Sequence, residues 1–269
     1  MFFHPQAEWR AIRMTFRKNL EGAMEIRKGF LIQIIGMMIN NCAFLIGWIF
    51  FFQVFGKING WSIPETIGLQ GIVAFVFGIG FTIGDGILSL PEYVHQGVFD
   101  QFLVSPRNLY LRILTSKLRV SALGDILFGL ILMSVYAVYA HLGLSQLILL
   151  ALFLPAAILL FFNVSLMTSL VAFALPDSSV ITKNLFEIFF SPSMYPASLY
   201  QGWLRGVFLF VIPSLAIGGV PIEAVRDHQW SSLAVIWALS IAWMFLTQFA
   251  LKQAIKKYES GNLTGARVV

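Results

Sequence analysis

The chain has 269 residues, of which 58% are hydrophobic and 12% are charged, with a mean hydropathy of +0.80 and a formal net charge of +5. Ordinary soluble domains are about half apolar and a quarter charged, so this composition excludes a water-soluble globular fold. The basic residues flank hydrophobic stretches, where they set membrane topology, and no nucleic-acid partner is expected.

The first 28 residues predict an amphipathic helix. Apolar residues recur at three- and four-residue spacing, and Arg and Lys fill many of the positions between Trp9, Ile12, Phe16 and Leu20. Such a helix lies at a membrane surface with its basic face toward anionic headgroups, so membrane lipid is an expected partner. Packing on a partner's soluble domain is the alternative. The segment lacks a short apolar core with a cleavage site, so we expect no cleaved signal peptide.

Six hydrophobic stretches follow, each of a length that can cross a bilayer as a helix. They are residues 30–55, 67–89, 120–140, 146–174, 180–199 and 231–251. Transmembrane strands would alternate polar and apolar residues, and these stretches do not. The sequence therefore predicts an all-α integral membrane protein. We expect one transmembrane domain over residues 1–269, with the membrane part at 30–251 and a tail at 252–269.

The distribution of Lys and Arg predicts the orientation. Of the 18 basic residues, 14 lie before the first stretch, after the second, or after the last. Because Lys and Arg favour cytoplasmic loops, both termini are expected in the cytoplasm, which requires an even number of crossings. Residues 203–222 contain Pro213 and Pro221 and would add a seventh crossing. We therefore expect an outer re-entrant helical hairpin from Trp203 to Val220, between the fifth and sixth spans.

No motif for catalysis or metal binding is present. The sequence has no G-x-x-x-x-G-K-[ST] phosphate loop, so this chain is not expected to hydrolyse ATP. The four histidines are scattered and the only cysteine is Cys42. We expect no catalytic residue, no metal site and no cofactor bound by this chain.

Polar residues within the hydrophobic stretches are candidates for function. Lys183 and Glu187 stand four residues apart, so they can pair on one helical face or act in gating and substrate contact. Asn40, Asn41 and Asn163 can form hydrogen bonds between helices or line a path. Gly80 and Gly84 form a G-x-x-x-G pattern, which indicates close helix packing.

The loop after the second stretch combines charged, aromatic and small residues. We expect Val98, Phe99, Phe102 and Leu103 to form one exposed apolar face, with Phe99 and Phe102 as anchors. An exposed apolar face needs a partner protein or the membrane interface to cover it, and both readings stay open.

Two runs of residues resemble a known family. The spacing Gly97-x-Phe99-Asp100-x-x-Leu103-x-x-Pro106 resembles a loop of type-2 ATP-binding-cassette exporter permeases. The later run with Tyr195-Pro196, Trp203-Leu-Arg205 and Pro213 is similar to the end of the fifth span and the outer re-entrant helices of that family. The resemblance covers nearly the whole chain and points to the subgroup that pairs two different permeases with one ATPase.

The resemblance implies a permease subunit that moves an amphiphilic, lipid-like, drug or polymer substrate outward. ATP and Mg would be bound by a separate ATPase, present in two copies. A second permease, a different chain or otherwise a second copy, would complete the unit in the plasma (cytoplasmic or inner) membrane of a prokaryote. The alternatives are a channel or substrate-capture protein that does not use ATP, or an intramembrane enzyme.

The resemblance also assigns residues to three parts of such a permease. The ATPase-coupling helix would contain Glu92, Tyr93, His95, Gly97, Val98, Phe99, Asp100, Phe102, Leu103 and Pro106. The connecting helix would contain Trp9, Ile12, Phe16 and Leu20. The outer re-entrant gate would contain Tyr195, Pro196, Trp203, Arg205 and Pro213.

Overall fold

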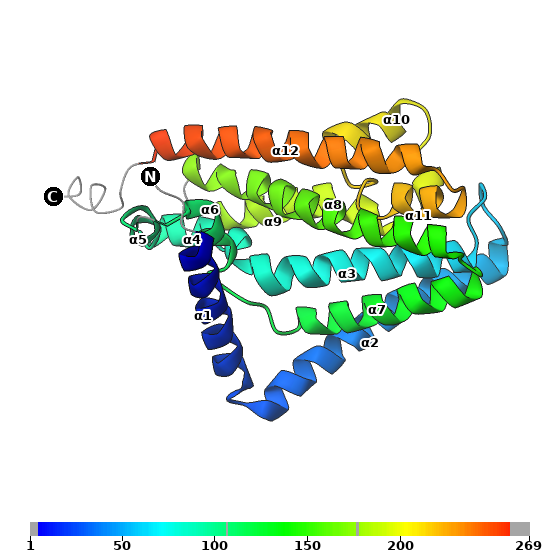
Figure 1. Ribbon diagram of the computed structural model, residues 1–269, viewed down its shortest axis with the longest axis horizontal. Coiled ribbons are helices and arrows are strands. Elements are labelled where there is room, and N and C mark those ends of the chain that lie inside the picture. Colours follow the sequence, from blue (N-terminus) through cyan, green and yellow to red (C-terminus); the bar gives the residue numbers. More distant parts are fainter. Residues whose placement is uncertain (1–4, 106, 176–177, 259–269) are drawn as a thin grey trace.

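The computed structural model describes residues 5–105, 107–175 and 178–258, except for the side chains of residues 5–8 and 11. Every regular element in these ranges is a helix, as the all-α prediction requires (Figure 1). The long helices are α1 (Pro5–Met24), α2 (Arg27–Phe55), α3 (Ile63–Leu88), α7 (Ala122–Tyr139), α8 (Leu144–Ser169) and α12 (Trp230–Lys256). The shorter helices are α4 (Leu90–His95), α5 (Phe99–Leu103), α6 (Leu109–Leu114), α9 (Ser179–Phe190), α10 (Trp203–Gly206) and α11 (Gly219–Arg226).

Helix α3 lies between α7 and α8 (Figure 1). It begins at a capping box, in which the Ser62 backbone N–H donates to the Glu65 carboxylate at 2.9 Å. Glycine lets α3 and α7 approach closely, since a Cβ at Gly78 would lie only 2.6 Å from the backbone nitrogen of Ile126. A Cβ at Gly129 would likewise lie 2.5 Å from the backbone nitrogen of Phe75. A larger residue at either glycine would force the two helices apart.

The G-x-x-x-G pattern of α3 faces α8 rather than α7. A Cβ at Gly80 would overlap the ring of Phe161, and a Cβ at Gly84 would lie 2.6 Å from Phe162 Cε1. The two glycines therefore make room for aromatic rings. The backbone-to-backbone approach occurs at Gly78 and Gly129, which are outside that pattern.

Five helical stretches in the described part of the chain are long and apolar enough to cross a membrane: Arg27–Phe55, Ile63–His95, Ala122–Tyr139, Leu144–Phe173 and Trp230–Lys256. The stretch expected at residues 180–199 instead contains α9, a helix of 12 residues, followed by two short 3₁₀ turns. Twelve helical residues cover roughly 18 Å, less than the ~30 Å hydrocarbon core. Pro192 and Pro196 interrupt the helix because proline has no backbone N–H to donate.

The bundle has two differently built ends. The α4–α6 end comprises α4, α5, α6, the start of α1 and the C-terminal end of α12 (Figure 1). The α11 end comprises α10, α11 and the loops that join α2 to α3 and α7 to α8 (Figure 1). A large hydrophobic core runs through the bundle, and a separate small cluster lies at the α4–α6 end.

Candidate functional site

The loop predicted as the coupling helix forms two short helices, α4 and α5, joined by a turn. Gly97 has a φ of 72°, in the left-handed region that glycine adopts without strain, and it reverses the chain between them. Arg112 on α6 then donates to the carbonyl of Phe102 at 2.7 Å and satisfies the end of α5. The segment is therefore a small packed structure. Pro106 lies outside the described residues.

Phe99 is buried, with 0% of its surface exposed, so the expectation that it forms an exposed anchor is wrong. Its ring packs edge-on against Phe173 and Tyr258, with centroid distances of 5.0 Å in both cases. Tyr258 also donates from its hydroxyl to Asp100 Oδ1 at 3.0 Å. The ring points inward because it packs against residues at the end of α12 and in the turn after α8. These residues are distant in sequence, so short-range sequence patterns do not reveal the contacts.

The exposed apolar surface of this loop is formed by the two residues that follow Phe102. Leu103 is 41% exposed and Val104 is 86% exposed. Phe102 and Val98 are half-buried, and Phe102 packs against Tyr93. Sequence reasoning missed Val104, although its position next to Leu103 in an apolar loop was the available signal.

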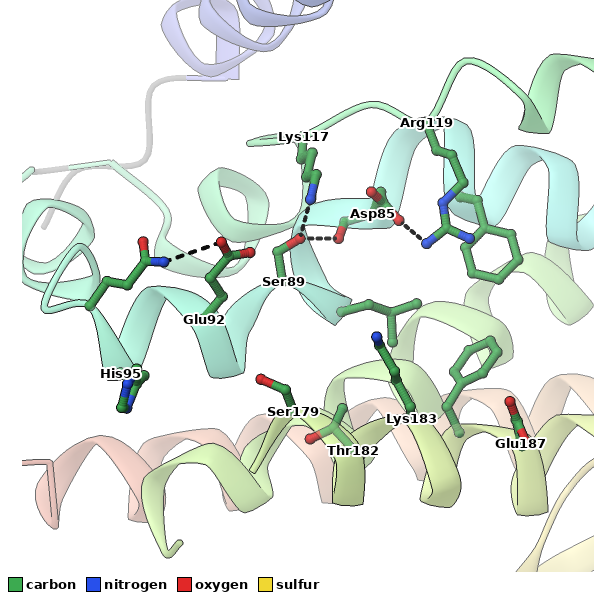
Figure 2. A pocket seen from close by; sticks show the side chains of 14 residues that line it. Asp85, Ser89, Glu92, His95, Lys117, Arg119, Ser179, Thr182, Lys183 and Glu187 are labelled. Carbon is green, nitrogen blue, oxygen red and sulfur yellow. Dashed lines mark hydrogen bonds and ion pairs between the residues drawn. The ribbon is translucent and has the colours of Figure 1, made fainter. Parts of the chain in front are cut away.

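A cavity of about 750 Å³ lies beside this loop, between α3 and α4 on one side and α9 on the other (Figure 2). Its charged lining is balanced, with three acidic and three basic residues: Asp85, Glu92, Glu187, Lys117, Arg119 and Lys183. His95, Ser89, Ser179 and Thr182 add further polar groups. Two of the predicted coupling residues, Glu92 and His95, thus line a cavity.

Ion pairing and hydrogen bonds fix one wall of the cavity (Figure 2). Arg119 forms an ion pair with Asp85, which is 5% exposed, and its guanidinium lies 4.2 Å from the Phe81 ring centroid. Lys117 donates to Ser89 Oγ at 3.2 Å. Removing either member of the Asp85–Arg119 pair would leave a partly buried charge without its partner, which is costly.

The opposite wall carries Lys183 and Glu187 on α9. Both residues are exposed and line the same cavity, and no ion pair joins them in the described structure (Figure 2). Their i,i+4 spacing permits a pair, but each side chain has open space in front of it. Of the two interpretations left open by the sequence, the described structure shows no pair, and it places both charges at the cavity.

The predicted outer gate region contains α10, a π-helical turn at Val207–Val211, an irregular segment and α11. Arg205 on α10 lies 2.5 Å from Glu223 on α11, and Glu223 also accepts from Trp61 Nε1 at 3.2 Å. The chain therefore returns on itself between Arg205 and Glu223. Trp203 is 76% exposed, whereas Pro213 is buried. Pro196 is also buried, and Tyr195 contacts Trp48 of α2 at a centroid distance of 5.9 Å.

Further polar contacts join the loops at the α11 end. Arg226 donates to the Gly60 carbonyl at 2.9 Å and pairs with Asp227 at 2.8 Å. The hydrogen bonds from Arg226 hold the pKa of Asp227 below its ordinary value. The Gln146 amide donates to the Val225 carbonyl at 2.8 Å, which joins the α7–α8 loop to α11.

The three asparagines that were candidates for helix packing or for lining a path occupy different environments. Asn41 donates to Asp125 Oδ1 at 2.5 Å and joins α2 to α7. Asn163 is 1% exposed and donates to the Leu159 carbonyl of its own helix, while Thr247 of α12 donates to the Asn163 carbonyl. Asn40 is exposed. Asn41 and Asn163 therefore take part in hydrogen bonds within and between helices, and neither lines the charged cavity.

The four residues assigned to the connecting helix lie on α1. Trp9 and Phe16 are exposed to 66% and 37%, and Ile12 and Leu20 are half-buried. Asn19 near the end of α1 donates to the Ser116 carbonyl at 3.4 Å, which fixes this helix against the segment before α7.

The fold and these sites define a helical membrane protein that carries a packed, partly exposed loop at one end. A family model described as ABC-2 family transporter protein matches residues 38–262. The chain therefore belongs to the ABC-2 transporter family and is a multi-pass membrane permease subunit of an ATP-binding-cassette transporter. Membership implies that it works with an ATP-binding-cassette ATPase. Neither a curated protein nor a solved structure matches the chain.

Proposed function

We propose that this chain is the membrane subunit of an exporter that moves an amphiphilic substrate outward, using ATP hydrolysed by a separate ATPase subunit. The observation that carries the proposal is the α4–α5 loop, which is packed against the end of α12 and exposes Leu103 and Val104. A loop fixed to a long bundle helix can transmit a push from a soluble subunit into the bundle. Lipid-like, drug and polymer substrates all fit this class.

The proposed topology has six crossings and both termini in the cytoplasm of a prokaryotic cell, with the α4–α6 end inside. The contact of Phe173 with Phe99 supports it, because α8 must end where α5 lies. The contact of Arg226 with Gly60 likewise requires α12 to begin at the α11 end. Between Phe173 and Arg226 the chain must therefore pass from the α4–α6 end to the α11 end. Residues 179–199 are the proposed fifth crossing, made of α9 and the turns after it.

Residues 203–220 are the proposed re-entrant outer hairpin. The ion pair between Arg205 and Glu223 supports this, since both arms of a hairpin that enters and leaves on one side must meet there. Buried Pro213 and Leu215 support it as well, because irregular backbone at membrane depth is tolerated when protein covers it.

We also propose that a second permease, a different chain or otherwise a second copy, packs beside α9, with two ATPase subunits below. The exposed charges of Lys183 and Glu187 support this partner, because exposed charges facing lipid are costly and a charged cavity shared between two permeases would be hydrated. Catalysis, ATP and Mg would then belong to the ATPase, with no cofactor bound by this chain.

The test of coupling changes the exposed loop without touching its core. Val104→Asp places a charge on the 86% exposed position and should reduce co-purification of the ATPase. The expected loss in affinity is about tenfold or more if Val104 lies at the centre of the interface. Membrane insertion and thermal stability should stay unchanged.

The matched control is Leu144→Asp, which introduces the same charge at a 76% exposed position at the opposite end of the bundle. An Asp in the first turn of a helix is favourable, so this variant should fold. Equal loss of ATPase with both variants, or none with Val104→Asp and Leu103→Asp together, would contradict the proposed docking surface.

A further inference from the structure

A second cavity lies between α1 and the bundle, apart from the loop that faces the ATPase. Its volume is about 240 Å³. One wall comes from α1 and the other from α3 and the segment before α7; the lining residues are Trp9, Ile12, Arg13, Phe16, Asn19, Thr82, Ile83, Thr115, Lys117 and Leu118. A cavity of ~150 Å³ with apolar walls accommodates benzene, so this one can hold a stretch of hydrocarbon chain.

The chemistry of the lining is amphiphilic. Its walls are formed by apolar side chains of both elements, and two cations, Arg13 and Lys117, lie among them with exposed side chains. The described lining contains no acidic residue that would neutralise these cations. A ligand that fits must therefore combine an apolar body with an anionic head.

Thr82 contributes an unpaired hydroxyl group to the cavity wall. This residue is 4% exposed and lines the cavity, and its hydroxyl oxygen has no hydrogen-bond partner in the described structure. Buried hydroxyl groups are nearly always hydrogen-bonded, so an unpaired one at a cavity wall points to a missing polar partner.

We propose that this cavity binds one anionic phospholipid, with an acyl chain between α1 and α3 and the phosphate between Arg13 and Lys117. The ester oxygens of such a lipid can accept from Thr82. A small soluble anion would leave the apolar wall without contact, and a zwitterionic headgroup would bring a cation toward two cations. The proposal needs only the membrane location of the chain and is independent of export and of ATPase coupling.

Lys117 links this site to the charged cavity, because it lines both. Its ammonium group donates to Ser89 Oγ at 3.2 Å. A phosphate at the α1 site would compete with Ser89 for this group. Bound lipid would therefore change the charge presented at one wall of the larger cavity.

The test is native mass spectrometry of the purified chain in detergent with dioleoylphosphatidylglycerol, and separately with dioleoylphosphatidylcholine. We expect one phosphatidylglycerol adduct per chain and a much weaker phosphatidylcholine adduct. Lys117→Gln and Arg13→Gln should each weaken the adduct roughly tenfold, by removal of a charged hydrogen-bond donor. Ile12→Trp keeps every charge but fills the cavity, and should weaken the adduct to a similar extent.

Arg10→Gln is the matched control, because Arg10 is an exposed cation of α1 that does not line the cavity. It should change binding by less than about twofold, since a single exposed charge contributes little. Equal effects of Arg10→Gln and Arg13→Gln, or equal binding of the two lipids, would overturn the proposal in favour of general surface attraction. Displacement of the lipid by equimolar inorganic phosphate, or a dimer without lipid, would overturn it in favour of an anion site or a second copy.

Discussion

At the α4–α6 end, the rings of Phe99, Phe173 and Tyr258 form a small core that holds the loop between α3 and α7. At the α11 end, the Glu223 carboxylate joins Arg205 and Trp61, and hydrogen bonds from Arg226 and Gln146 tie the surrounding loops together. Apolar packing resists deformation because a packed core has few alternative arrangements. Charged and hydrogen-bonded contacts can be exchanged for water or for other polar partners.

This difference suits the two tasks of the proposed exporter. A loop that receives force from an ATPase must move as one body with the helices it contacts, and the aromatic core supplies that rigidity. A segment over the exit of a path must release and re-form its contacts, and the Arg205–Glu223 pair allows this. Substitutions at the two ends should therefore have different effects.

The largest effect is expected for Phe99→Ala. Removing a fully buried ring leaves a cavity, and such changes cost about 3–5 kcal/mol of unfolding free energy. Thermal unfolding in detergent should show this loss, together with loss of ATPase coupling. Phe249→Ala, at a ring of α12 that is 62% exposed, is the control and should be close to the wild type. Equal stability of the two variants would contradict the packed core.

A smaller effect is expected at the other end for Glu223→Gln. The variant loses the ion pair with Arg205, and hydrogen bonds to charged groups contribute about 1.5–3 kcal/mol. Asp227→Asn removes the more exposed pair with Arg226 and should cost less than about 1 kcal/mol. Cysteine labelling at Leu204→Cys in a Cys42→Ser background measures the release of α10. Labelling that is no faster with Glu223→Gln would contradict the proposed role of the Arg205–Glu223 pair in holding α10.

A still smaller effect is expected for Tyr258→Phe, which keeps the ring against Phe99 and removes only the hydrogen bond to Asp100. The expected cost is about 1 kcal/mol, the usual net contribution of one hydrogen bond. Amide hydrogen exchange in α5 should become faster. Tyr139→Phe, at a 59% exposed tyrosine of α7, should leave that exchange unchanged. If protection in α5 is the same in both variants, the hydroxyl does not anchor the loop.

The sequence predicted the helical class and most of the long helices, because stretches of apolar residues without charge have few other structures open to them. It did not predict that α9 would end at Phe190, since residues 180–199 are apolar enough for a full span and the breaks come from two prolines. It also treated Val98, Phe99, Phe102 and Leu103 as one exposed face. Phe99 turns inward because Phe173 and Tyr258, distant in sequence, lie against it.

The charged cavity shows the same limit. Lys183 and Glu187 were visible as a possible pair, but Asp85, Lys117 and Arg119 come from other segments, and only the folded chain brings all five to one cavity. Spacing along one helix reports which groups can meet. It does not report whether side chains from other segments surround those groups and make a pair between them unnecessary.

The smallest effect on stability is expected for Lys183→Gln and Glu187→Gln. If the two charges were paired within hydrocarbon, removing one would leave the other without a partner and would strongly destabilise the protein. Both side chains instead face an open cavity, so each change should alter the unfolding free energy by less than about 0.5 kcal/mol. Substrate-stimulated ATPase activity of the assembled transporter should nevertheless change, because each variant alters the charge balance of the cavity. Asn184→Ala, at an exposed neighbour on α9 that does not line the cavity, should change neither quantity. A large loss of stability with either single variant, rescued by exchanging Lys183 and Glu187, would restore the pair and remove the argument for a second permease at this wall.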